Sequence, residues 1–313
     1  MKQLENSLRI KVLGVCNRNC RFCHQEGSMG MLEEIQYTEE LGTVINTLSA
    51  EFGIYSVAIT GGEPLLHSDL LELVRNLSKK TKIQQFSLTT NGTVVKDYDY
   101  WKEFVSLGLR KVNLSMPDLL TTIRATGENR SITVYQNQIE TICILNKLGI
   151  IPNINIVVYN DKKYLTNILN VLFHESQAMF TIALLPDLTD ESTFAYSQTI
   201  ISEIINEFNF SIVQESHRKG TSNTVCDYKT DKGILLQVKT TKQSGGPKRL
   251  NALCSKCNHY NHCQEGFYGL RLEKCNSKYY IRLCLYRSDS EVLLTLNDFL
   301  KSPVYDELKE IWQ

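Results

Sequence analysis

The stretch "LRIKVLGVCNRNCRFCHQEG", residues 8–27, joins a β-rich run to three closely spaced cysteines. Cys16, Cys20 and Cys23 form a C-x3-C-x2-C pattern, and thiolates at such short spacing usually hold a metal. Closed zinc and iron–sulfur sites take four protein ligands, whereas reactive metal sites leave one coordination position open. Three thiolates directly after a predicted strand therefore predict a metal site with an open position.

This strand is the first of six predicted strands, which alternate with helix-like segments. The helical segments are apolar at about i, i+3, i+4 and i+7, and connections of this length imply right-handed parallel βαβ units. A doubly wound sheet and a barrel both fit this alternation. We expect an α/β fold that forms a partial (β/α)6 barrel. The other five predicted strands cover residues 54–60, 83–90, 110–116, 152–160 and 179–187.

Short polar motifs follow or occupy the successive strands. "TGGEP" (residues 60–64) ends the second strand, "TTNG" (89–92) the third and "NLS" (113–115) the fourth, while "NIN" (153–155) lies in the fifth. Both architectures place their chemistry at the carboxyl ends of the strands. Each motif alone is typical of a simple turn, because Gly and Asn-Gly favour turns in any fold. Their recurrence on successive strands predicts one functional rim.

The strand–helix alternation stops near residue 215, where Gly-, Ser- and Lys-rich segments lead to a second group of cysteines. We expect a barrel domain over residues 1–215 and a small iron–sulfur extension over residues 216–313. The 313-residue chain carries 34 basic and 34 acidic side chains, so we expect neither a nucleic-acid polymer nor a membrane as partner. Without a membrane-length apolar run or a signal peptide, we expect a cytoplasmic protein, where clustered cysteines indicate metal ligands.

With the aromatic Phe22 before its last cysteine, the C-x3-C-x2-C loop resembles the radical S-adenosylmethionine (SAM) superfamily. The resemblance implies a [4Fe–4S] cluster on Cys16, Cys20 and Cys23, with SAM bound at the open iron. It also implies reductive cleavage of SAM to a 5′-deoxyadenosyl radical, and a flavodoxin- or ferredoxin-type electron donor. The SAM contacts that it implies are Gly61, Gly62, Glu63, Pro64, Thr90, Asn91, Ser115, Arg124 and Asn155.

Longer segments resemble the branch of this superfamily that contains GTP 3′,8-cyclase of molybdenum-cofactor biosynthesis. They include the N-terminal stretch quoted above, "IRATGENRS" (residues 123–131) and "GLRLEKCNSKYYIRLCL" (269–285). Of the three C-terminal arginines of that branch, Arg271 and Arg282 are matched here, and Arg9 matches a further arginine of its GTP site. The resemblance implies that these arginines contact the substrate.

The departures from that branch bear on the substrate. Ser56 and Ala58 stand where the branch carries basic residues, Gly269 replaces the first C-terminal arginine, and the chain ends "KEIWQ" rather than in a Gly-Gly tail. We therefore expect a smaller or less charged substrate than GTP. Glu26, directly after the cysteine loop, is a candidate acid or base facing that substrate, or a residue that braces the loop.

The second cysteine group, "CSKCNHYNHC" (residues 254–263), has the spacing C-x2-C-x5-C. Such pairs hold zinc or an iron–sulfur cluster, and the resemblance favours an auxiliary [4Fe–4S] cluster of the SPASM/twitch type. Cys254, Cys257 and Cys284 match the three ligands in the cyclase branch, and Cys263 is a candidate fourth. Three and four ligands both remain open. Cys143, on the apolar side of a helical pattern, is expected in the core.

Together these patterns predict a radical SAM enzyme that abstracts hydrogen from a small substrate. A nucleoside, nucleotide or nucleotide-sugar of specialised metabolism is the expected substrate class. Two alternatives are a maturase of ribosomally made peptides and a molybdopterin-forming GTP cyclase. A metal-binding protein without catalysis is disfavoured by the intact C-x3-C-x2-C and GGEP motifs.

Overall fold

The computed structural model describes residues 2–18, 20, 23, 32–116, 128–158, 162–175, 178–188, 190–231, 233–240 and 247–312. Six parallel strands, each followed by a helix, confirm the predicted (β/α)6 barrel. The strands are β2 (Ser7–Lys11), β3 (Ser56–Thr60), β4 (Gln85–Thr90), β5 (Leu109–Ser115), β6 (Asn153–Val158) and β7 (Thr181–Pro186). The helices are α1 (Glu39–Phe52), α2 (Leu70–Lys80), α3 (Tyr98–Ser106), α5 (Glu128–Lys147), α6 (Lys162–Glu175) and α7 (Glu191–Glu207).

Local capping residues fix where several of these helices begin and end. Thr38, Asp69, Asp97 and Asp190 precede α1, α2, α3 and α7, and each side chain accepts a hydrogen bond from a backbone N–H of the first turn. Gly53 ends α1 in the left-handed conformation (φ 62°), which a residue without Cβ adopts at little cost. The helix boundaries therefore follow from local sequence.

The barrel strands are apolar on the outside and polar on the inside. In β2, Leu8 and Ile10 pack in the hydrophobic core, whereas Ser7 and Arg9 line an internal cavity. The same alternation recurs in the next three strands: Val57, Ile59, Leu88, Val112 and Leu114 lie in the core, and Ser56, Ala58, Ser87, Thr89, Lys111 and Asn113 line the cavity. Most inward-facing side chains of these strands are thus polar, unlike the branched apolar side chains that fill a closed barrel.

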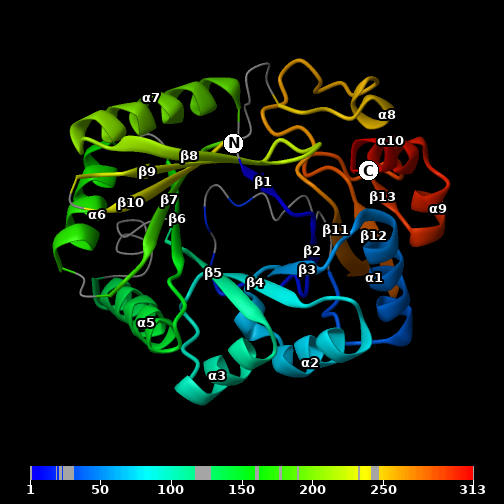
Figure 1. Ribbon diagram of the computed structural model, residues 1–313, viewed down its shortest axis with the longest axis horizontal. Helices are drawn as coiled ribbons and strands as arrows, with labels where there is room; N and C mark the ends of the chain where they lie inside the picture. The colour runs from blue at the N-terminus through cyan, green and yellow to red at the C-terminus, as the bar shows by residue number, and fades with distance from the viewer. Residues whose placement is uncertain are drawn as a thin grey trace.

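Three further strands extend the sheet beyond β7: β8 (Ser211–Arg218), β9 (Thr224–Lys229) and β10 (Leu235–Thr240). β10 pairs in parallel with β7, β9 lies between β10 and β8, and β8 pairs with β1 (Lys2–Leu4). Since β1 continues into β2 after two residues, the N-terminal segment contacts both flanks of the parallel sheet. Figure 1 shows the strands arranged around a centre, with the helices of the βα units outside.

The remaining strands, β11 (Arg271–Cys275), β12 (Lys278–Arg282) and β13 (Leu293–Leu294), continue the sheet beyond β2. They are accompanied by the helices α8 (Asn251–Cys254), α9 (Leu296–Leu300) and α10 (Pro303–Trp312). Phe52 of α1 contacts Phe299, Tyr305 and Trp312, so the C-terminal helices pack against the barrel (Figure 1). One sheet runs through the domain boundary that we predicted after residue 215.

The prediction that Cys143 lies in the core is wrong. Cys143 is exposed, because the buried face of α5 follows Gln138, Thr141, Ile142 and Leu145. None of the helices within the described ranges is long and apolar enough to cross a lipid bilayer.

Candidate functional site

The two glycines of "TGGEP" pack against the backbone that leads to Cys16. A Cβ on Gly61 would lie 2.5 Å from the carbonyl oxygen of Leu13, and one on Gly62 would lie 2.1 Å from that of Val15. The amide of Gly62 donates to Leu13 O (2.9 Å), and that of Glu63 to Val15 O (2.8 Å). The absence of Cβ at these two positions therefore lets the turn approach, and position, the segment before the first cysteine.

Glu63 joins the second strand end to the third. Its carboxylate is 1% exposed and accepts hydrogen bonds from Thr90 Oγ1 (2.5 Å) and the amides of Asn91 (2.6 Å) and Leu65 (3.0 Å). Burial raises the pKa of Glu63 above its usual value, while these donors act in the opposite direction. Pro64 opens the single helical turn Pro64–Leu66 that follows. The predicted SAM contacts Glu63, Thr90 and Asn91 thus form one rigid group.

Asn91 links this group to the cysteine loop. Its Nδ2 donates to Asn17 Oδ1 (2.9 Å) and lies 3.9 Å from Cys16 Sγ. Gln138 of α5, which the sequence reasoning missed, donates from one amide nitrogen to Asn91 O (2.7 Å) and Ser115 O (3.2 Å). Gln138 is 2% exposed. A buried polar side chain needs a hydrogen-bond partner, so a glutamine on the apolar face of a helical pattern was the sequence signal that could have identified it. Gln138 thereby holds the ends of β4 and β5 together.

The three cysteines of the first group lie beside this rim, beyond the end of β2. The amide of Cys23 donates a hydrogen bond to Cys20 O (3.0 Å). Burial, with the negative charges of Glu63 and Cys23 nearby, raises the pKa of the Cys16 thiol. A bound cation would make its thiolate the stable form, so this donor set fits an iron–sulfur cluster. The predicted residues Glu26 and Arg124, like Phe22, lie outside the described residues.

Ser115 and Asn155 are neighbours on β5 and β6. The side chain of Asn155 does not stand alone, because its Oδ1 accepts a hydrogen bond from Lys239 Nζ of β10 at 2.7 Å. The SAM rim predicted from the sequence is thereby connected to a strand from beyond residue 215. Nothing in the short motifs indicated this contact.

Below this rim, the barrel encloses a cavity of about 380 Å³. Among the described residues, its lining includes one carboxylate, Glu5, and six basic side chains. The basic side chains are Arg9, Arg110, Lys111, Arg218, Lys239 and Arg271. Such an accumulation of positive charge in a concave polar site is suited to an anionic ligand.

The predicted substrate arginines divide into two groups. Arg9 and Arg271 are partners in the β2–β11 pairing and both line the cavity. Arg271 is 3% exposed and its guanidinium lies 3.2 Å from Glu265 Oε1. Arg282 is absent from the described cavity lining and forms a two-point ion pair with Glu273, with distances of 3.0 and 2.9 Å. Arg282 Nη1 also donates to the carbonyl oxygens of Cys284 and Arg287.

The second cysteine group gathers around Cys254. Burial, followed by the nearby thiols of Cys263, Cys284 and Cys257, raises the pKa of Cys254 to about 11. The amide of Gly266 points at Cys263 Sγ (3.3 Å), as backbone donors do at iron–sulfur thiolates. The thiols of Cys257, Cys263 and Cys284 therefore lie near Cys254, an arrangement that fits a bound cluster. Within the described residues, no three possible ligands converge closely enough to hold a single metal ion.

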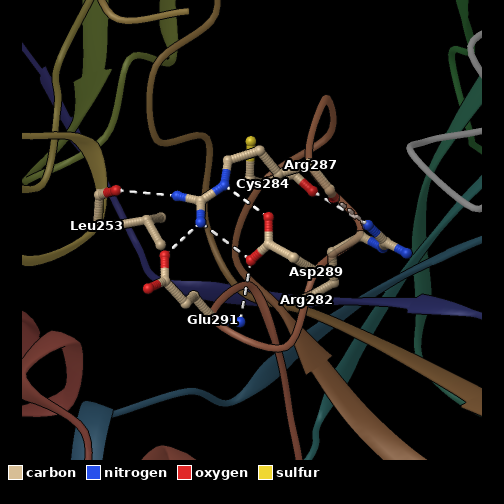
Figure 2. A network of polar contacts seen from close by, with 6 residues as sticks. All are labelled: Leu253, Arg282, Cys284, Arg287, Asp289 and Glu291. Carbon is tan, nitrogen blue, oxygen red and sulfur yellow. Dashed lines mark hydrogen bonds and ion pairs between the residues drawn. The ribbon is translucent and has the colours of Figure 1, made fainter. Parts of the chain in front are cut away.

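Arg287 holds two parts of this cysteine group together, and the sequence reasoning missed it. Its guanidinium donates to Leu253 O (3.2 Å), next to Cys254, and binds Asp289 through two contacts of 2.8 and 2.9 Å. Figure 2 shows Arg282 and Arg287 on opposite sides of the loop that carries Cys284 and Asp289, with Glu291 as a further partner of Arg287. Both arginines therefore position Cys284 relative to Cys254.

Known proteins resemble this chain in sequence and in fold. The model of the radical SAM superfamily matches residues 10–163. A probable GTP 3′,8-cyclase of Methanococcus aeolicus is 38% identical over 125 residues, which span 38% of this chain and 41% of that relative. One of Sulfurisphaera tokodaii is 28% identical over 291 residues, or 91% of this chain and 82% of the relative. The solved structure "Native anSMEcpe with bound AdoMet" covers 96% of this chain and 82% of its own, with a TM-score of 0.58 and 17% identity, which is a likeness of fold.

Proposed function

Because this chain carries a radical SAM domain and is an enzyme of that superfamily, we propose that it acts on a small anionic substrate held inside the barrel. A nucleotide or nucleotide-sugar is the substrate class that fits best. The observation that carries this proposal is the cavity of about 380 Å³ with six basic side chains and one carboxylate in its lining. Although Ser56 and Ala58 carry no charge, β5, β8 and β10 also contribute basic side chains to the cavity, which supports an anionic substrate.

In this proposal, the two cysteine groups would hold clusters at opposite ends of the barrel. Cys16, Cys20 and Cys23 would hold a [4Fe–4S] cluster. Bound there, the cluster would supply the single electron for reductive cleavage of SAM and so for hydrogen abstraction from the substrate. We assign the donation of that electron to a flavodoxin- or ferredoxin-type protein. The barrel wall would exclude water from the reacting atoms.

At the other end, the second cysteine group would hold an auxiliary cluster, with Cys263 as the fourth ligand beside Cys254, Cys257 and Cys284. A cluster with four protein ligands leaves no iron for the substrate. In this proposal Arg271 contacts the substrate, whereas Arg282 positions the Cys284 loop. Arg271 and Arg282, which both match arginines of the cyclase branch, thus have different proposed roles.

The substrate class is tested by measuring how fast reduced, reconstituted enzyme forms 5′-deoxyadenosine from SAM. We expect a guanine or uridine nucleotide to stimulate this rate, and the corresponding uncharged nucleoside to have little effect. Equal stimulation by nucleoside and nucleotide, or stimulation by peptides alone, would contradict the proposal. A peptide response would instead favour the maturase alternative.

A second candidate is cyclisation of GTP itself. It is favoured by the relatives named probable GTP 3′,8-cyclase and by the presence of both Arg9 and Arg271 in the cavity. The mass spectrum of the GTP-containing reaction separates the two possibilities. A cyclised nucleotide product supports this second candidate, and unchanged GTP excludes it.

A further inference from the structure

Strand β10 carries two side chains that each contact one asparagine of the "NIN" segment in β6. Lys239 Nζ donates to Asn155 Oδ1 at 2.7 Å, and Asn153 Nδ2 donates to Gln237 Oε1 at 3.2 Å. On both strands the two residues involved are two positions apart, as side chains on one face of a strand are. A strand from beyond residue 215 therefore holds both amides of this motif.

Lys239 reaches Asn155 across β7, the strand that lies between β6 and β10. Ala183 is the β7 residue paired with Asn155. Its neighbours Ile182 and Leu184 pack in the hydrophobic core, so the side chain of Ala183 is on the inner face of the strand. Because alanine carries only a methyl group, the long side chain of Lys239 can cross β7 at this point.

The hydrogen bond from Lys239 decides which end of the Asn155 amide faces β10. An ammonium group has only donors, so it takes the carbonyl oxygen and leaves the N–H2 group on the side away from β10. The distance of 2.7 Å is typical of a charge-assisted hydrogen bond. Ser115, the β5 partner of Asn155, lies on that other side. An apolar side chain in place of Lys239 would remove the group that selects this orientation.

The side of Ser115 is also the side of the first cysteine group. Gln138 donates from one amide nitrogen to Ser115 O and Asn91 O, and Asn91 Nδ2 lies 3.9 Å from Cys16 Sγ. The N–H2 group of Asn155 is thus a donor on the rim where SAM is expected. It suits the acceptor atoms of the adenosine part of SAM, which are ring nitrogens and ribose oxygens.

We propose that Lys239 is a positioning residue for SAM, which fixes the amide of Asn155 so that its N–H2 group donates to the adenosine part. This assignment rests on the proposed function, because it needs SAM bound at the rim. Lys239 acts through Asn155 and does not itself touch SAM. A buried lysine, whose charge is costly to the fold, thereby contributes to cofactor binding.

The assignment is tested by equilibrium dialysis of SAM against the full chain, reconstituted with its clusters and kept without reductant so that SAM is not cleaved. The dialysis is done at pH 6, where the ammonium form predominates, because burial lowers the pKa of Lys239 to about 7. We expect Lys239→Met to weaken SAM binding about tenfold, and Lys239→Arg, which also has only donors, to retain it. Gln237→Met is the matched control. It removes the contact with Asn153 from the same strand and should leave SAM affinity unchanged.

Variants of Asn155 show whether Lys239 acts through this residue. Asn155→Asp keeps an acceptor for Lys239 but has no N–H2 group, so it should weaken SAM binding as Lys239→Met does. In an Asn155→Ala background, Lys239→Met should cause no further loss, because both changes remove one interaction. Lys239→Met removes a buried charge, so its melting temperature at pH 6 should not fall, and weaker binding would not reflect a damaged fold.

The assignment is overturned if Lys239→Met binds SAM as tightly as Gln237→Met does. It is also overturned if Lys239→Met weakens binding equally with and without the side chain of Asn155. In both cases the unaltered chain still binds SAM, so the proposed function stands. Failure of the unaltered, iron-loaded chain to bind SAM would contradict the proposed function itself, and this assignment with it.

Discussion

At the scale of single residues, the buried charges of Arg282 and Lys239 differ in how far the protein compensates them. Arg282 is 1% exposed and fully engaged by Glu273 and two backbone carbonyls, so its charge is compensated by the protein. Among the described residues, Lys239 donates a hydrogen bond to the amide of Asn155 and forms no ion pair. From the sequence, Arg271 and Arg282 were both expected to contact the substrate. Spacing along a strand does not show which arginine forms an ion pair with a carboxylate of the protein.

Replacing Arg282 with Met should lower the free energy of unfolding by about 3 kcal/mol, because Glu273 would remain buried without its main partner. Lys80→Met is the matched control. It breaks an exposed ion pair with Glu39 and should cost less than about 1 kcal/mol. Urea denaturation of both variants measures the difference. Equal, small losses would show that the Arg282–Glu273 pair does not stabilise the fold.

Lys239 should make stability depend on pH in a predictable direction. Its pKa is about 7 in the folded chain and near 10.5 when unfolded, so between these values the unfolded state binds more protons and stability rises with pH. Below pH 7 both states are protonated, and the folded state carries the full penalty of the buried charge. Lys239→Met should therefore raise the melting temperature most at pH 6, with a gain that shrinks toward pH 10. A gain that is constant over this range would contradict the assignment.

At the scale of elements, the rim is assembled from strand ends that brace one another. Gly62, Glu63, Asn91 and Gln138 connect the first four strand ends through short hydrogen bonds. The motifs TGGEP and TTNG were visible in the sequence because their turns have local signatures. Gln138 was not predicted, since a helix pattern does not reveal which carbonyls a buried amide will meet.

Gly62→Ala tests this bracing directly. The added Cβ would collide with Val15 O, so we expect the segment before Cys16 to shift and the first cluster to be lost. Iron should fall from about eight ions per chain, two clusters of four, to about four. Gly149→Ala is the control, because a Cβ there meets nothing within 4 Å; its positive φ should cost only about 1 kcal/mol of stability. Full iron occupancy in Gly62→Ala would contradict the role of the turn.

At the scale of the whole molecule, the strands of the described residues form one sheet that spans the barrel and both of its flanks. The six βα units were predictable because each is local in sequence. The pairing of β1 with β8 and of β2 with β11 joins residues more than 200 positions apart, and no local pattern indicates such partners. The same pairings bring Arg218 and Arg271 to the cavity.

This continuity has a consequence for the predicted boundary at residues 215 and 216. A chain truncated to residues 1–215 loses β9 and β10 on one flank and β11 on the other, so the edge strands β7 and β2 are exposed. We expect the truncated chain to lack a cooperative thermal transition by calorimetry, and the full chain to unfold in one. A truncated chain that melts cooperatively would show that the barrel is an independent domain.

Reductive cleavage of SAM by a cluster on the three rim thiolates would be measured as release of 5′-deoxyadenosine. Full-length protein, reconstituted without oxygen and supplied with SAM and dithionite, should release 5′-deoxyadenosine and methionine in equal amounts. Cys20→Ala should release neither. Absence of 5′-deoxyadenosine from fully iron-loaded protein, or equal release by Cys20→Ala, would contradict the account.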